Sequence, residues 1–126
     1  MKKLIAILVL FVGFSMTTQA QNKMMKDAVK TVSLEQTKGE FTQKSITLSE
    51  GTYVFEIANT NVGHDVGFVL APKGKTAQKF HIKEAYVKSL AKNNTKSKTN
   101  KVKLKKGEYV YFCPLNPTPQ YTLVVE

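Results

Sequence analysis

The chain has 126 residues, and its 19 basic residues are all lysines. With nine acidic residues the formal net charge is +10, and a single cysteine excludes an internal disulfide. The absence of arginine argues against nucleic-acid recognition, which usually relies on arginine forks and stacking aromatic side chains.

The N-terminal segment has the pattern of a secretory signal peptide. Lys2 and Lys3 precede an apolar run over residues 4–14, and a small-x-small cleavage site follows at residues 18–20. The run is shorter than the roughly 20 residues that a transmembrane helix needs. We therefore predict a signal peptide over residues 1–20 and export of the mature chain to the periplasm or out of the cell.

After the signal peptide comes a mainly polar segment, residues 21–28, which we predict to be a disordered lead into the domain. We predict that residues 29–126 form a single domain. Within this domain apolar and polar residues alternate, which is typical of half-buried strands. Turn residues separate the alternating stretches, as in Thr37-Lys38-Gly39. The predicted strands cover residues 29–35, 41–48, 53–58, 66–70, 102–104, 107–113 and 121–125.

The least regular part of the domain is the crossover over residues 75–100. Ala77, Phe80, Val87 and Ala91 have a spacing that suits one face of a helix, while residues 85–90 could equally form a short strand. We predict a mobile, partly helical crossover that ends in a loop over residues 93–100. Short strands separated by frequent turns favour an all-β fold, either a sandwich or a small barrel.

The lysines are concentrated in one part of the chain. Twelve of them lie between residues 73 and 106, where Glu84 is the single acid. Such a face could bind an acidic partner protein or an anionic surface, and the alternative is that it only solvates the protein. The candidate binding residues are Lys96, Lys98, Lys101, Lys103, Lys105 and Lys106.

Few side chains in this sequence could carry chemistry. The two histidines are His64 and His81, and Asp65 adjoins the first of them. Neighbours on a strand point to opposite faces, so this pair is poorly placed for a Ser-His-Asp site. The sequence has no glycine-rich phosphate loop and no Cys-x-x-Cys motif. We therefore predict that the protein is not an enzyme.

The only cysteine, Cys113, lies between two predicted strands. It is followed by Pro114, Pro117 and Pro119, which restrict the backbone of this loop with or without a bound metal. Two interpretations of the cysteine stay open at this point. It is either a metal ligand or a small buried apolar group.

Two motifs in this sequence resemble those of the cupredoxins, the blue copper proteins. The first is Leu48-x-x-Gly51-x-Tyr53-x-Phe55-x-Ile57-x-Asn59, which runs on to His64. The second is Leu104-x-x-Gly107-Glu108-Tyr109-Val110-Tyr111-Phe112-Cys113-Pro114. The resemblance covers nearly the whole mature chain in layout and implies a cupredoxin-like Greek-key β-sandwich. It also implies copper as the cofactor, with His64 as one ligand and Cys113 as the thiolate.

The resemblance is incomplete in the second motif. The family has a second histidine a few residues after the cysteine, and here that place holds Asn116. For the axial position of the copper site, Gln120 is the only usual donor nearby. Blue copper electron transfer depends on two histidines, a cysteine and a weak axial ligand. The ligand set that the resemblance implies is therefore His64, Cys113, Asn116 and Gln120, and it is incomplete.

Three functions stay open for the exported protein, which we expect to be a monomer. The first is a cupredoxin-like protein that binds copper at this incomplete site and for which electron transfer is disfavoured. The second is a working copper electron carrier with a ligand other than histidine, serving an acidic redox partner. The third is a metal-free interaction module that uses its lysine-rich face.

Overall fold

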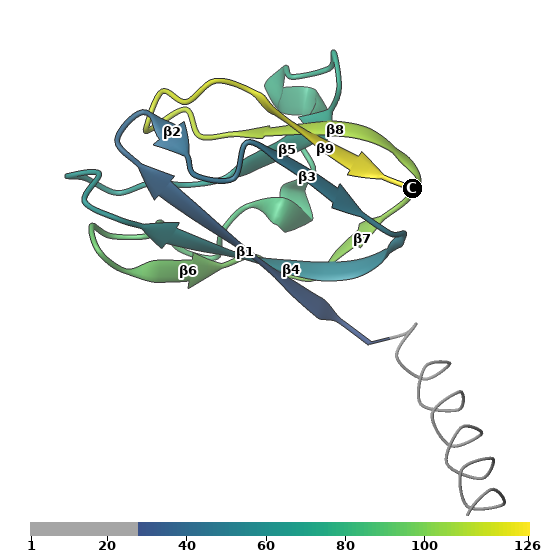
Figure 1. Cartoon of the computed structure of the whole chain (residues 1–126), viewed down its shortest axis with the longest axis horizontal. Coiled ribbons are helices and arrows are strands. Elements are labelled where there is room, and N and C mark those ends of the chain that lie inside the picture. The colour runs from purple at the N-terminus through teal and green to yellow at the C-terminus, as the bar shows by residue number, and fades with distance from the viewer. Residues whose placement is uncertain (1–27) are drawn as a thin grey trace, which may run out of the picture.

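The computed structural model describes residues 28–126, which form two β-sheets packed face to face (Figure 1). The predicted signal peptide and nearly all of the predicted lead lie outside the described residues. Two 3₁₀ turns, η1 (Gln78–Phe80) and η2 (Lys83–Ala85), lie in the crossover. The strands are β1 (Lys30–Thr37), β2 (Glu40–Phe41), β3 (Ser45–Leu48), β4 (Gly51–Asn59), β5 (Val69–Pro72), β6 (Lys96–Lys98), β7 (Val102–Leu104), β8 (Gly107–Phe112) and β9 (Tyr121–Val125).

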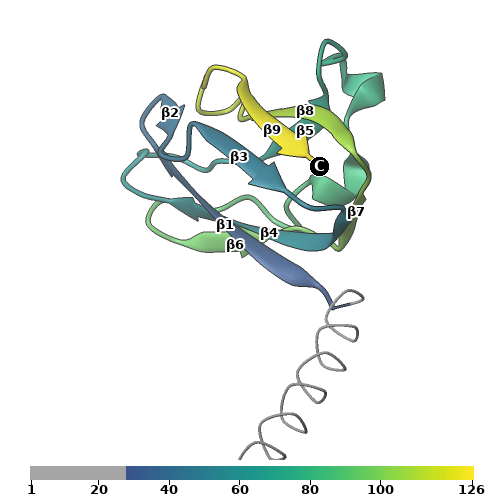
Figure 2. The ribbon, with the colours of Figure 1, turned by 45° about the vertical axis from the view of Figure 1, so that its right-hand side comes forward.

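The chain crosses between the two sheets several times. Sheet A has the order β2-β1-β4-β6, with β7 also paired to β4, and sheet B has the order β3-β9-β8-β5. The β1–β4 and β3–β9 pairs are parallel, and the other ladders are antiparallel. Figure 2 shows the two layers from a second direction. The predicted cupredoxin-like Greek-key sandwich is confirmed.

The core lies between the sheets and is built by the alternation that the sequence shows. On β4, Tyr53, Phe55 and Ile57 are buried, while the residues between them face outward. Phe55 stacks on Phe68 with ring centroids 5.2 Å apart, and Phe41 meets Tyr111 edge to face at 5.2 Å. Burial of each large apolar side chain contributes about 1.5–3 kcal/mol, so this aromatic cluster is a main source of stability.

The predicted strand over residues 41–48 is wrong as a single element. Phe41 ends β2, which pairs with β1 in sheet A, whereas Ser45 begins β3, which pairs with β9 in sheet B. Between them the Thr42 N–H donates to the Glu35 carbonyl at 2.8 Å, and the Gln43 side chain accepts from the Glu35 N–H at 2.8 Å. The sequence carries a sign of this change, because Phe41 and Ile46 lie an odd number of residues apart and the four residues between them are polar.

The strand predicted over residues 66–70 begins later in the structure. Val66 forms only an isolated bridge to Ala91, and β5 starts at Val69 and ends at Pro72. A proline is tolerated there because β5 is the edge strand of sheet B, where one side of the backbone has no ladder partner.

The crossover is partly helical, as predicted, but in the form of the two 3₁₀ turns. The predicted loop over residues 93–100 is wrong in part, because β6 pairs there with β4 and sets Lys98 opposite Glu56. Lysines alternate with Ser97 in this strand, so it lacks the apolar alternation by which strands were predicted. The strand alternative for residues 85–90 reduces to one bridge, between Val87 and Thr99.

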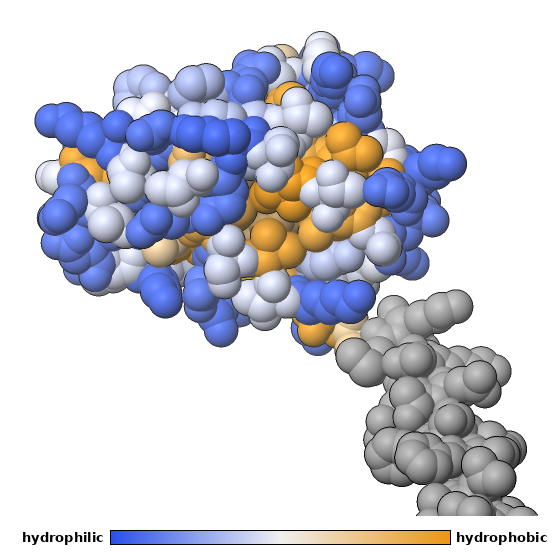
Figure 3. Space-filling view, in the orientation of Figure 1, coloured by the Kyte–Doolittle hydropathy of each residue, from blue (hydrophilic) through white to orange (hydrophobic). Residues whose placement is uncertain are grey.

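Figure 3 shows apolar side chains along the seam between the two sheets, surrounded by hydrophilic ones. The strands β1 and β3 contribute half-buried residues that pack against the core, namely Val32, Ile46 and Leu48.

Within residues 28–126, no helix has the length and apolar character that crossing a membrane requires.

Candidate metal centre

Cys113 follows directly after β8 and lies at the end of the core. Its side chain is fully buried, and its sulfur accepts a hydrogen bond from the Gly67 N–H at 3.4 Å. The Cys113 N–H donates to the Thr118 hydroxyl at 2.9 Å, and the Thr118 N–H donates back to the Cys113 carbonyl at 3.2 Å. The loop after the cysteine is therefore closed by its own hydrogen bonds, in addition to the restriction that its prolines impose.

Gly67 lies beneath Leu90 of the crossover. A Cβ atom on residue 67 would be 3.2 Å from Leu90 Cδ2, which is closer than an ordinary van der Waals contact. The absence of a side chain lets the crossover cover the backbone that donates to the Cys113 sulfur. Leu90 thus covers Gly67, although Leu90 itself is 47% exposed.

His64, the predicted imidazole ligand, lies in the loop between β4 and β5 and is exposed. Its Nδ1 is 3.0 Å from the carbonyl oxygen of Asp65, and its own carbonyl accepts a hydrogen bond from the Asn59 side chain at 2.7 Å. The residue of this loop that contacts the Cys113 sulfur is Gly67. The structure thus places the His64 ring at the surface and the thiol in the interior.

Asn116, the residue in the place of the missing histidine, is buried and fully hydrogen-bonded. Its Nδ2 donates to the Gln36 Oε1 at 3.1 Å and to the Thr37 carbonyl at 2.8 Å. Its Oδ1 accepts from the Gly39 N–H at 2.8 Å. Gly39 has φ +79°, a left-handed conformation that glycine adopts without strain. The amide therefore fastens the C-terminal loop to the turn between β1 and β2.

Gln36 connects the asparagine to the thiol. Its side chain is fully buried, and its Nε2 donates to the Gly67 carbonyl at 2.7 Å. Since Gly67 also donates to the Cys113 sulfur, one hydrogen-bonded chain runs from Asn116 through Gln36 and Gly67 to the cysteine. We call these four residues the closing network. Sequence reasoning missed Gln36, although its inward place after Val32 and Leu34 was a signal for a buried polar residue.

The last predicted ligand, Gln120, is exposed just before β9. In residues 28–126, no group of three or more His, Cys, Asp and Glu side chains is arranged to hold a metal ion. A blue copper ion needs two imidazoles beside the thiolate. Here one imidazole is at the surface and the Asn116 amide is engaged by three partners, so these residues do not fit such an ion.

His81, the second histidine, lies in the crossover and stabilises it. One ring nitrogen is 2.7 Å from the Tyr86 hydroxyl, and the other is 2.9 Å from the Thr76 carbonyl. The ring also packs edge to face on Phe112, with centroids 6.0 Å apart. Both nitrogens are used within the fold.

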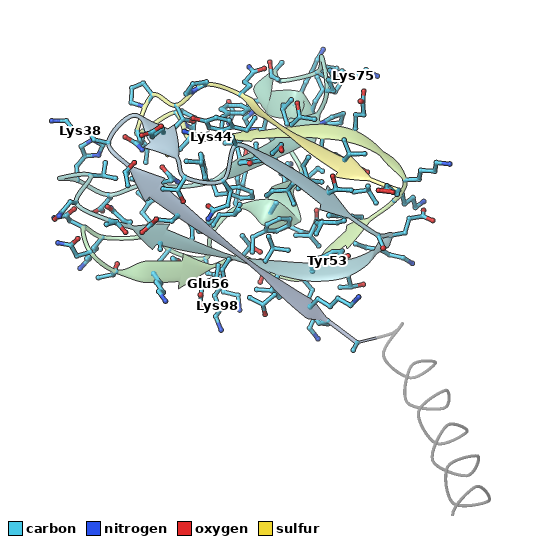
Figure 4. The ribbon with its side chains drawn as sticks, in the orientation of Figure 1. Lys38, Lys44, Tyr53, Glu56, Lys75 and Lys98 are labelled. Carbon is cyan, nitrogen blue, oxygen red and sulfur yellow. The ribbon has the colours of Figure 1, made fainter. Side chains whose placement is uncertain are left out.

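The predicted lysine face divides into two parts in the structure. Lys98 on β6 lies opposite Glu56, and Lys103 on β7 lies opposite Thr52. Figure 4 shows Lys98 and Glu56 pointing away from sheet B, on the outer side of sheet A. Lys105 and Lys106 belong instead to the turn before β8, where the Lys106 N–H donates to the Glu50 side chain at 2.9 Å.

Comparisons with solved structures find proteins of similar fold, whereas a search of curated proteins finds no match. One of them is auracyanin A, a "blue" copper protein from the green thermophilic photosynthetic bacterium Chloroflexus aurantiacus. It is 18% identical to this chain, with a TM-score of 0.61, and the match covers 79% of this chain and 100% of auracyanin A. Auracyanin B is 16% identical with a TM-score of 0.61, over 77% of this chain and 88% of its own.

An azurin from the obligate methylotroph Methylomonas sp. strain J is 18% identical with a TM-score of 0.51, over 76% of this chain and 97% of its own. At these identities the likeness shows the fold alone. The family model described as a cupredoxin-like domain matches residues 4–125. The chain therefore belongs to the cupredoxin-like domain family, as its two motifs predicted.

Proposed function

We propose that this chain is an exported cupredoxin-family binding module that docks an acidic partner protein on the outer side of sheet A. The observation that carries the proposal is the set of lysines that the fold gathers on this side. We call this set the outer lysine face, and it consists of Lys88, Lys96, Lys98, Lys101 and Lys103.

The closing network supports a binding role over electron transfer. Asn116 makes three hydrogen bonds and Gln36 is fully buried, so the end of the sandwich that holds Cys113 is stabilised by the protein itself. A type 1 electron carrier needs a preset ligand geometry at that end. The side chains there are instead committed to joining the C-terminal loop to β1.

Electrostatics support an acidic partner. The exported form, residues 21–126, has 17 lysines and nine acidic residues, a formal net charge of +8, and the outer lysine face concentrates part of that charge locally. A surface of one sign raises the rate of encounter with a partner of opposite sign and weakens as salt screens it. Lysines also present single flexible charges, which suit scattered carboxylates rather than planar bidentate recognition.

The proposed docking is tested with poly-L-glutamate as the acidic probe. The purified exported form, residues 21–126, is titrated with it by calorimetry at about 50 mM and about 500 mM NaCl. We expect binding at the lower salt concentration and its loss at the higher one. A chain that shows no binding at low salt contradicts the proposal.

Export is supported by the charged, apolar and small-residue pattern of residues 1–20. N-terminal sequencing of the protein recovered from the periplasm or medium is expected to begin at Gln21. A full-length chain that stays in the cytoplasm contradicts this part of the proposal.

Copper binding is the second candidate function, and one contact favours it. The Gly67 N–H that donates to the Cys113 sulfur would also stabilise a thiolate, and a thiolate suits Cu(I). His64, Asn116 and Gln120 are the remaining predicted donors, and Asn116 could serve only by giving up hydrogen bonds that its amide makes within the fold. Competition for Cu(I) with a coloured chelator tests it, because the wild-type chain would take the metal from the chelator and Cys113→Ser would not.

A further inference from the structure

We propose that Lys88, Lys98 and Lys101 form a discrete subsite for one side-chain carboxylate of an acidic protein segment. The inference rests on the proposed function and locates the binding of the acidic partner at one position within the outer lysine face. These three lysines line a surface depression of about 540 Å³ on the outer side of sheet A. Its other lining residues are Thr31, Val54, Thr99 and Asn100.

The backbone pairing forces two of the lysines together. The bridge between Val87 and Thr99 is antiparallel, and the Lys88 N–H donates to the Lys98 carbonyl at 3.0 Å. Lys88 and Lys98 are therefore directly opposite each other, and both line the same depression. Like charges directly opposite on neighbouring strands destabilise the pairing. An anion bound between them would remove that repulsion.

Carboxylates of the protein do little to neutralise this depression. Among residues 28–126, the ion pair formed by these lysines is the one between Lys98 Nζ and Glu56 Oε2, at the long distance of 4.0 Å. None of the seven lining residues is acidic. A neighbouring depression of about 240 Å³ on the same sheet differs, since Glu35 and Glu56 line it together with Lys96. The positive charge is thus concentrated in the first depression.

The remaining lining residues favour a glutamate or aspartate side chain over a bare anion. The hydroxyl of Thr31 and the amide of Asn100 can donate hydrogen bonds to a carboxylate. Val54 supplies an apolar contact that the methylene groups of an acidic side chain can cover, and inorganic phosphate has no such groups.

A lipid surface is the less favoured occupant. Proteins that lie on anionic membranes usually combine lysines with large apolar side chains that enter the interface. The exposed large apolar residues among residues 28–126 do not line this depression. They are Val29, Phe80, Leu90 and Leu115.

The subsite is tested with two triple variants that remove the same charge. The first is Lys88→Gln, Lys98→Gln, Lys101→Gln, and the control is Lys75→Gln, Lys105→Gln, Lys106→Gln, whose three lysines lie outside the outer lysine face. A blocked tetraglutamate peptide is titrated into the exported form of each at about 50 mM NaCl, with binding followed by amide NMR shifts. We expect the first variant to lose about tenfold in affinity and the control less than about threefold.

In the wild-type chain, the shifted amides are expected to cluster at the depression. A separate readout needs no ligand: the single variant Lys88→Gln should unfold at a higher temperature, because the repulsion across the bridge is removed.

Equal losses in the two triple variants would overturn the subsite while leaving the proposed function standing, since binding would then follow overall charge. Absence of binding by the wild-type chain would overturn both. Displacement of the peptide by inorganic phosphate at equal concentration, or binding only to phosphatidylglycerol vesicles, would also overturn the assignment to an acidic protein segment.

Discussion

Asn116 and Gln36 are 80 residues apart in the chain, yet their side-chain amides meet in the interior with Nδ2 and Oε1 3.1 Å apart. The asparagine stands where the resemblance to cupredoxins leads us to expect a copper-binding histidine, and the glutamine belongs to the first strand. Their contact joins the C-terminal loop to sheet A at the end of the sandwich that holds Cys113.

Asn116→Ala should destabilise the protein by about 2–3 kcal/mol, because it leaves the buried Gln36 Oε1 and the partly buried hydrogen-bonding groups of Thr37 and Gly39 without their partner. Urea unfolding followed by fluorescence or circular dichroism measures the loss. Gln120→Ala is the matched control, since Gln120 is exposed in the same loop region, and it should change stability by less than about 0.5 kcal/mol. Similar small effects of both changes would show that the closing network does not hold the loop.

The Cys113 thiol should react slowly with a disulfide reagent such as Ellman's reagent while the protein is folded. Since the side chain is fully buried, we expect the reaction to be at least about 100-fold slower than in the urea-unfolded chain. Leu90→Ala should speed it up, because Leu90 covers Gly67 beside the sulfur. Val29→Ala, at a residue 40% exposed just before β1, is the control and should leave the rate unchanged. Rapid reaction of the folded wild-type chain is the contrary result.

Tyr111 should make the folded protein less stable at high pH. Burial, with a smaller contribution from Tyr121, raises the pKa of Tyr111 from 10.0 to about 12. The unfolded chain therefore loses this proton near its ordinary pKa, while the folded chain retains it to about pH 12. The stability contributed by the neutral phenol is complete below pH 10.0 and falls as the pH rises toward 12.

The measurement is the free energy of unfolding as a function of pH in the wild type and in Tyr111→Phe. The variant loses the hydrogen bond to the Gln43 carbonyl, so it starts at lower stability, but its curve should be flatter over this range. Parallel curves would contradict the assignment of the slope to Tyr111.

His81→Ala should loosen the crossover without unfolding the sandwich. The change removes the contacts to Tyr86 and Thr76, and we expect faster amide hydrogen exchange over residues 76–86 and a loss of about 1–2 kcal/mol. His64→Ala is the natural comparison, since that ring is exposed, and it should leave exchange in the crossover unaltered. Unchanged exchange in both variants would mean that His81 does not hold this segment.

The sequence predicted the fold class because the alternation on β4, β8 and β9 is regular. It failed where pairing rather than apolar alternation defines a strand. β6 consists of two lysines and a serine, and it forms because β4 has a free edge beside it. The break between Phe41 and Ser45 was overlooked although the alternation changes phase there, since Phe41 and Ile46 lie an odd number of residues apart.

For the candidate site, the sequence indicated the relevant residues but not their roles. The motif drew attention to Cys113 and Asn116, and both lie at the same end of the sandwich. The partner that explains the asparagine is Gln36, which is distant in sequence and belongs to no motif. Lys88 was missed for a similar reason, because only the bridge between Val87 and Thr99 brings it to Lys98.

The central claim is that this cupredoxin-family chain keeps the fold while its own side chains close the end that would hold blue copper. The most direct measurement is the absorption spectrum of the purified exported form during titration with Cu(II). We predict no intense blue band from thiolate-to-copper charge transfer. A strong blue band that both Cys113→Ser and His64→Ala abolish would contradict the claim and establish a copper centre.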